Sequence, residues 1–168
     1  RLFLDWGGPP TTRYLRHGNR EFNEITRCRI HQKLRAIGLE VPNREDQHQN
    51  RCMADTYYES CIQELIRRTR NTKKFPLVFK GLVEYAFRRN MLGLKPFGLF
   101  TSLVSLAGAA WSAYASWSPD EPPAVAIASI LIIGGILWAW LTWVTAHSVR
   151  LAANRYARFI LEAALDQE

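Results

Sequence analysis

Two long runs without a charged side chain constrain this sequence more than any other feature. Residues 97–119 and 122–149 contain no Asp, Glu, Lys or Arg over 23 and 28 positions. About 20 apolar residues are enough for a helix to cross ~30 Å of hydrocarbon. The sequence therefore predicts membrane-spanning helices at about 97–117 and 124–146. They are joined by residues 118–123, which contain three prolines and two acids, and so short a turn requires an antiparallel hairpin.

The charged residues gather in the other half of the chain. Residues 1–95 hold 19 of the 22 Lys and Arg residues and 10 of the 15 Asp and Glu residues, a net charge of +9. Lys and Arg collect at the cytoplasmic ends of membrane spans. The bases that flank the two spans are Arg88, Arg89, Lys95, Arg150, Arg155 and Arg158, and the turn at 118–123 has none. We therefore expect an inner-membrane protein with both ends of the chain in the cytoplasm and the turn outside.

Hydrophobic periodicity predicts helices throughout the basic half. Asn23 suits the N-cap of one helix and Gly38 its C-terminal stop, and further helices are expected at about 43–70 and from Pro76 onward. After the second span the apolar stripe continues without Gly or Pro, which predicts one helix over 124–165, roughly 60 Å long. The cytoplasmic part of this helix would pack on the N-terminal helices, or on its copies in a homo-oligomer.

The predicted fold class is an all-α membrane protein with three parts. They are a basic cytoplasmic helical region at 1–95, a transmembrane hairpin at 96–147 and a cytoplasmic C-terminal helix at 148–168. The first residue is Arg1 rather than Met, so we also expect that further residues precede it in the natural protein.

Small and weakly polar residues follow helical spacing in the two spans. Gly108, Ser112 and Ser116 repeat every four positions, and such a face lets helices approach closely. Two interpretations stay open. The small residues pack the hairpin against itself, or their hydroxyl groups line a pathway in an oligomer without the cost of a buried charge. The candidates for either role are Ser102, Ser105, Gly108, Ser112, Ser116, Gly134 and Gly135.

Clustered bases in the cytoplasmic region are candidates for binding an anion, because a guanidinium group can donate two parallel hydrogen bonds to it. The bases near the N-terminus include Arg20, Arg27 and Arg29. The residues predicted to bind an anion or a lipid headgroup are Arg13, Arg16, Arg67, Arg68, Arg70, Lys73, Lys74, Arg88 and Arg89. Three kinds of partner fit these bases: anionic membrane lipids, a phosphorylated ligand such as a nucleotide messenger, or nucleic acid bound without regard to its sequence.

The three cysteines are expected to be reduced thiols, as is usual on the cytoplasmic side of a membrane. Two Cys and two His residues are enough to bind tetrahedral zinc, and Cys28, His31, His48 and Cys52 have helical spacing within each pair. Neither pair has the Gly or Pro residues of a zinc knuckle, so we expect no metal and no cofactor. No nucleophile elbow, HExxH, paired-carboxylate or kinase motif is present, and we therefore expect no enzymatic activity.

From about residue 75 onward, the layout of the chain resembles the small two-span membrane effectors of bacterial nucleotide-signalled anti-phage defence systems. The resemblance is one of architecture and includes no specific motif. It implies a cytoplasmic region that senses an anionic ligand or a partner protein, and oligomerised hairpins that open the membrane as an ion channel or perturb it. The alternatives are a structural anchor subunit of a larger membrane complex and a membrane-tethered module that binds nucleic acid.

Overall fold

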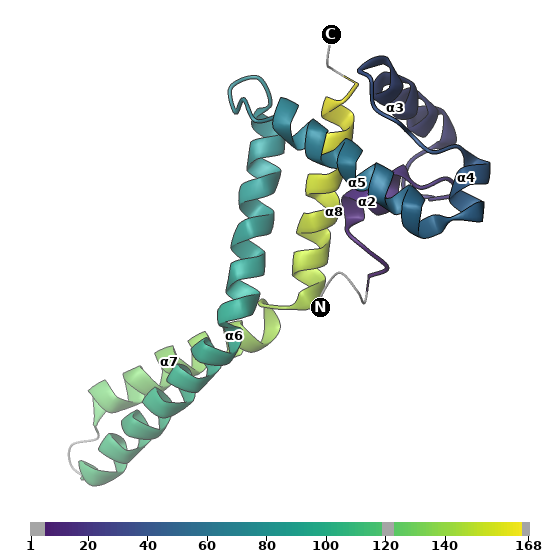
Figure 1. The fold of residues 1–168 in the computed structure, drawn as a ribbon. Coiled ribbons are helices and arrows are strands. Elements are labelled where there is room, and N and C mark those ends of the chain that lie inside the picture. The colour runs from purple at the N-terminus through teal and green to yellow at the C-terminus, as the bar shows by residue number, and fades with distance from the viewer. Residues whose placement is uncertain (1–5, 119–122, 166–168) are drawn as a thin grey trace. The chain divides into compact units, whose positions relative to one another are not determined.

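The computed structural model describes residues 6–118 and 123–165, and these residues form seven helices and no strand (Figure 1). The all-helical prediction is confirmed for this part of the chain. Most of the predicted outward turn at 118–123, and the end of the predicted C-terminal helix at 166–168, lie outside the described residues. The chain divides into two compact units. Unit 1 comprises Arg1–Tyr85 together with Arg150–Glu168, and unit 2 comprises Ala86–Val149.

Unit 1 is built from several helices, of which α3 and α5 begin at a capping asparagine side chain. Its elements are α2 (Pro10–Leu15), α3 (Glu24–Ala36), α4 (Arg44–Gln49), α5 (Arg51–Arg68), the start of α6 (Pro76–Ala115) and most of α8 (Ala146–Ala163). Asn23 caps α3 as predicted, because its side chain accepts a hydrogen bond from the N–H of Ile25 at 3.3 Å. Gly38 follows the end of α3 with φ of 84°, a left-handed conformation that favours glycine.

The core of unit 1 joins the two separated parts of its sequence. The side chains from α2, α3 and α5 include Leu15, Ile30, Leu34, Tyr58 and Leu65, and those from α8 include Ala157, Ile160 and Leu161, all at most 1% exposed. The expectation that the C-terminal helix packs on the N-terminal helices is therefore confirmed. The segments that come before and after unit 2 in the sequence share one hydrophobic core.

Two helices that we expected to be continuous are interrupted, in each case at a capping side chain. The predicted helix at 43–70 breaks into α4 and α5 at Asn50, whose side chain accepts a hydrogen bond from the N–H of Met53 at 3.1 Å. The predicted helix at 124–165 breaks into α7 (Ala124–Thr142) and α8, where Oγ1 of Thr145 accepts from the N–H of Ser148 at 3.2 Å. Both predictions were wrong because Asn and Thr are strong N-caps that can start a new helix without Gly or Pro.

The opposite happens in α6, where two expected helices form one. The predicted helix that begins at Pro76 and the first predicted span are a single helix of 40 residues, with Pro96 inside it. Proline lacks the N–H that would donate to the carbonyl four positions earlier, at Leu92, yet the helix continues on both sides. The helices α6 and α7 are both long and apolar enough to cross a membrane. In the apolar 18-residue stretch of each helix, only 6% is buried.

Candidate anion site and membrane-spanning helices

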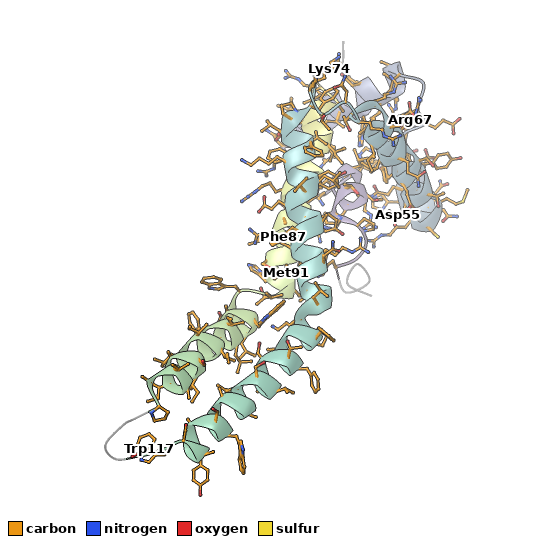
Figure 2. All side chains as sticks on the ribbon, turned by 90° about the vertical axis from the view of Figure 1, so that its left-hand side faces the viewer. Asp55, Arg67, Lys74, Phe87, Met91 and Trp117 are labelled. Atoms are coloured by element: carbon orange, nitrogen blue, oxygen red, sulfur yellow. The ribbon has the colours of Figure 1, made fainter. Side chains whose placement is uncertain are left out.

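The two arginines near the N-terminus that were predicted to bind an anion instead make hydrogen bonds within unit 1. The guanidinium of Arg16 pairs with both carboxylate oxygens of Asp55 on α5, at 2.7 and 2.8 Å, and also donates to the carbonyl of Gly7 at 3.0 Å. Asp55 is labelled in Figure 2. Arg13 donates to the carbonyl of Trp6 at 3.0 Å. These bonds fix the segment before α2, and all three nitrogens of the Arg16 guanidinium already donate within unit 1.

Two clefts adjoin the turn at residues 17–19. The larger, of about 580 Å³, is lined by Trp6, Gly7, Arg13, Arg16, Gln47, His48 and Arg51 in addition to this turn. The smaller, of about 290 Å³, is lined by the same turn and by Arg20, Phe22, Glu24, Arg27 and Arg44. Bases that are far apart in the sequence therefore meet on one side of unit 1.

Arg27 is the most buried base at the smaller cleft, at 4% exposed. Its Nη1 donates to the carbonyl of Asn19 at 2.7 Å, and its Nη2 lies 3.6 Å from Oε1 of Glu24, whose side chain is 75% exposed. Its Nε is buried and has no hydrogen-bond partner among the residues that the structure describes. Arg20 and Arg44 are exposed, and neither has a partner within the described part of the chain.

A buried histidine lies next to these clefts. Nε2 of His31 donates to the carbonyl of Leu15 at 2.9 Å, and its ring stands 4.9 Å from that of His17 and 6.2 Å from that of Tyr58. Burial lowers the pKa of His31 to about 4, although the hydrogen bond to Leu15 opposes this shift. His31 is therefore neutral at pH 7 and serves as a core residue of unit 1.

The structure does not bring the four candidate zinc ligands together. Cys28, His48 and Cys52 are exposed, whereas His31 lies in the core. Among residues 6–118 and 123–165, no group of three or more His, Cys, Asp or Glu side chains could hold a metal ion.

The second predicted basic cluster is partly neutralised by one carboxylate. Arg67 and Arg68 both pair with Glu64, at 2.7 and 2.8 Å, and the hydrogen bonds from these two arginines lower the pKa of Glu64 to about 2. The cluster continues with Arg70, Lys73 and Lys74, which are exposed, and Nζ of Lys74 lies 5.6 Å from the centre of the Phe75 ring (Figure 2). The last two predicted bases, Arg88 and Arg89, belong to unit 2, where Arg89 is exposed.

In unit 2, α6 and α7 meet at Gly98, which is not among the packing residues predicted from the sequence. A Cβ atom on Gly98 would stand 2.4 Å from the ring of Trp140, so no larger residue fits there without a shift. One turn further along, Ser102 is 7% exposed and donates to the carbonyl of Gly98 at 2.7 Å.

Lys95 caps the C-terminal end of α7. In the sequence this residue stands out only as a charge beside the predicted span, which does not predict this contact. Its ammonium donates to the carbonyl of Val144 at 2.8 Å and to that of Leu141 at 3.4 Å. The last carbonyls of a helix have no partner within it and carry partial negative charge, so a cation there is stabilising. A signal was available in the sequence, since Lys95 is the last base before the apolar run.

The other small residues face outward from this chain. Ser105, Gly108, Ser112, Ser116 and Gly135 are exposed, and no heavy atom would lie within 4 Å of a Cβ added at Gly108, Gly134 or Gly135. Of the candidate packing or pore-lining residues, only Ser102 is buried in the described hairpin. The repeated small face of α6 is thus open to another helix.

Comparisons with models of protein families, with curated proteins and with solved structures find no match to this chain. The chemistry of its own residues is therefore the basis for assigning a function.

Adding one methyl group at Gly98 should weaken the helix pair. We expect Gly98→Ala to cost about 1–3 kcal/mol, because the new Cβ overpacks against Trp140. Gly108→Ala is the matched control, since its Cβ meets no atom within 4 Å. Five of the six tryptophans lie in unit 2, so tryptophan fluorescence during an SDS titration in mixed micelles reports on the hairpin. Equal midpoints for the two variants would contradict the close contact.

Unit 1 should lose stability in mild acid. The pKa of His31 is about 4 in the folded protein and about 6.5 when the chain is unfolded, so the unfolded state binds the extra proton between these values. The free energy of unfolding should therefore fall as the pH drops from about 6.5 to about 4, by on the order of 3 kcal/mol. Thermal unfolding followed by circular dichroism measures this.

The matched variants for this pH experiment are His31→Gln, which keeps a donor for the carbonyl of Leu15, and His48→Gln at an exposed position. The first should remove most of the dependence between pH 6.5 and 4, and the second should keep it. The same slope in both variants would show that other groups cause the loss of stability.

Proposed function

We propose that this chain is a non-catalytic integral membrane effector. Unit 1 binds an anionic ligand or a partner in the cytoplasm, and the hairpins of several copies associate in the inner membrane and open or perturb it. The observation that carries this proposal is the single core of unit 1, which is built from chain segments on both sides of the apolar helix pair.

The apolar surface of the helix pair supports a membrane environment. Large hydrophobic side chains of α6 and α7 are more than half exposed, among them Leu103, Val104, Trp111, Val125, Leu131 and Ile132. An apolar surface this extensive is not stable in water and marks a contact with lipid or with protein. Helices satisfy their own backbone hydrogen bonds, which makes them suitable for the hydrocarbon region.

The shared core supports an even number of membrane crossings. The chain leaves unit 1 after Tyr85 and re-enters it at Arg150, and both residues belong to segments of one compact body. The two ends of unit 2 therefore start on the same side of the membrane, and the two apolar helices provide the crossing and the return. The bases next to these ends favour the cytoplasm for that side.

The open small-residue face supports association between copies. Gly108 and Ser112 are exposed one turn apart on α6, and Ser116 is exposed just after its end, so a helix from a second copy can approach closely along this face. The same α6 has residues in both units without a break, so a change at its start in unit 1 acts on a helix that continues into the hairpin.

A second candidate function is an anchor subunit of a larger membrane complex. It is favoured by exposed apolar side chains at the start of α6 within unit 1, namely Leu77, Phe79, Leu82 and Val83. Such a surface fits a different protein, and this role needs neither a ligand nor a pore.

The membrane arrangement can be tested with single cysteines. In a chain whose native cysteines are replaced by serine, Ser118→Cys should react with a membrane-impermeant maleimide only from outside the inner membrane. A chain that keeps only the exposed Cys52 should react only from the cytoplasmic side, as seen with inverted vesicles. Labelling of both positions from one side would contradict the hairpin.

The effector and the anchor differ in what they assemble with. We expect the particle in nanodiscs to be a homo-oligomer whose mass, measured by light scattering, is a multiple of 19.3 kDa after subtraction of lipid and scaffold. Ser112→Leu should reduce it to a monomer, because the larger side chain blocks the small face. Ala110→Leu adds similar bulk to the opposite face and should leave the mass unchanged. A monomeric wild type, or a particle that contains other polypeptides, would favour the anchor.

A further inference from the structure

We propose that the smaller cleft of unit 1 binds a phosphoryl group, held by Arg20, Arg27 and Arg44. This inference rests on the proposed function, because it identifies the place and the chemical class of the anion that unit 1 would recognise. The residues that the sequence favoured for this role near the N-terminus, Arg13 and Arg16, are not the ones that hold the ligand.

The cleft gathers positive charge from three separate segments. Arg20 lies in the loop before α3, Arg27 lies on α3, and Arg44 is the first residue of α4. Glu24 is the one carboxylate that lines the cleft, so the described lining has an excess of two positive charges. At about 290 Å³, its volume is at the lower end of the range for ligand pockets and fits a small phosphorylated group rather than a long chain.

Arg27 carries the strongest part of the argument, because it is a buried charge that lacks adequate compensation. It is 4% exposed, its closest carboxylate oxygen is 3.6 Å away, and its Nε–H has no acceptor within the described part of the chain. Burying a charge is costly unless the charge is paired and hydrogen-bonded. An anion in the cleft would supply compensating charge to this guanidinium group, and phosphate oxygens match its planar donor geometry.

The neighbouring contacts hold Arg27 in place before a ligand arrives. The bond from its Nη1 to the carbonyl of Asn19 fixes one side of the guanidinium against the 17–19 turn. The same turn is tied to α4, because the N–H of His17 donates to the side chain of Gln47 at 2.8 Å. Arg20 and Arg44 have no partner within the described residues and are free to close on an anion.

Three of the arginines predicted to bind an anion are already paired with carboxylates. Arg16 is paired with Asp55, and Arg67 and Arg68 share Glu64. These guanidinium groups would have to give up a charge-assisted bond to bind an external anion, whereas those at the smaller cleft would gain one.

The test is the binding of inorganic pyrophosphate to the full chain in a non-ionic detergent, measured by calorimetry at constant ionic strength. We expect Arg20→Ala and Arg44→Ala each to weaken the Kd about tenfold or more, since each loses a charge-assisted hydrogen bond. Both side chains are exposed, so neither change is expected to unfold unit 1. Arg29→Ala, an exposed position on the same helix as Arg27 and outside this cleft, should stay within about twofold of the wild type.

A lipid headgroup also contains a phosphoryl group. A second binding experiment distinguishes a headgroup from a free phosphorylated ligand. In nanodiscs of phosphatidylglycerol, headgroups that occupy the cleft would weaken pyrophosphate binding relative to phosphatidylcholine, and this competition should vanish in Arg44→Ala. Equal affinities in the two lipids would instead indicate a free phosphorylated ligand. Both results support the site.

Two outcomes overturn the inference. Wild-type protein that does not bind pyrophosphate rules out the cleft as a phosphoryl site. Binding that Arg20→Ala and Arg44→Ala leave unchanged places the anion elsewhere on unit 1. In that second case the proposed effector function survives, whereas a monomer in the mass measurement would remove that function even if the cleft binds its ligand.

Discussion

Burial of α8 against α2, α3 and α5 is the interaction on which the rest of this structure depends. The side chains of Ala157, Ile160 and Leu161 are completely buried, and each Leu or Ile removed from water in this way contributes about 1.5–3 kcal/mol. Without α8, the apolar faces of the N-terminal helices would have no cover at this side of the core. The same contact brings the two ends of the hairpin back to one body, and the proposed membrane arrangement follows from it.

The contacts between α6 and α7 are of a different kind, and they suit the membrane environment that we propose for these helices. Lipid would remove the hydrophobic driving force between helices, so close packing and polar contacts would matter more. The fit of Trp140 against Gly98 provides the first, and the bond from Lys95 to the carbonyl of Val144 provides the second. Both contacts join the middle of α6 to the C-terminal end of α7, and the outward small residues beyond them are left for other helices.

Sequence reasoning succeeded where a single local signal decides the outcome. The charge-free runs predicted the presence of both apolar helices. The cap at Asn23 and the glycine at Gly38 predicted the two ends of α3. It failed at Asn50 and Thr145, where a capping side chain competes with a continuous apolar stripe and the stripe alone does not show which wins.

The candidate site was harder to predict because its residues depend on distant partners. Arg16 looks like a free base until α5 brings Asp55, 39 positions away, within 2.7 Å. Arg44 had no distinguishing neighbour in the sequence, and only the fold places it beside Arg20 and Arg27. The clustering of bases predicts an anion site among them, whereas charge pairing across the fold determines which guanidinium groups remain available.

The divided core of unit 1 also sets an order of events during synthesis. A ribosome makes the chain from the N-terminal side, so α2 to α5 emerge while α8 does not yet exist. The 64 residues of unit 2 lie between them, and at about 5–20 residues per second their translation takes several seconds. During that interval the apolar side chains of the N-terminal helices lack the contact with α8. The core of unit 1 is therefore completed only after the whole of unit 2 has been synthesised.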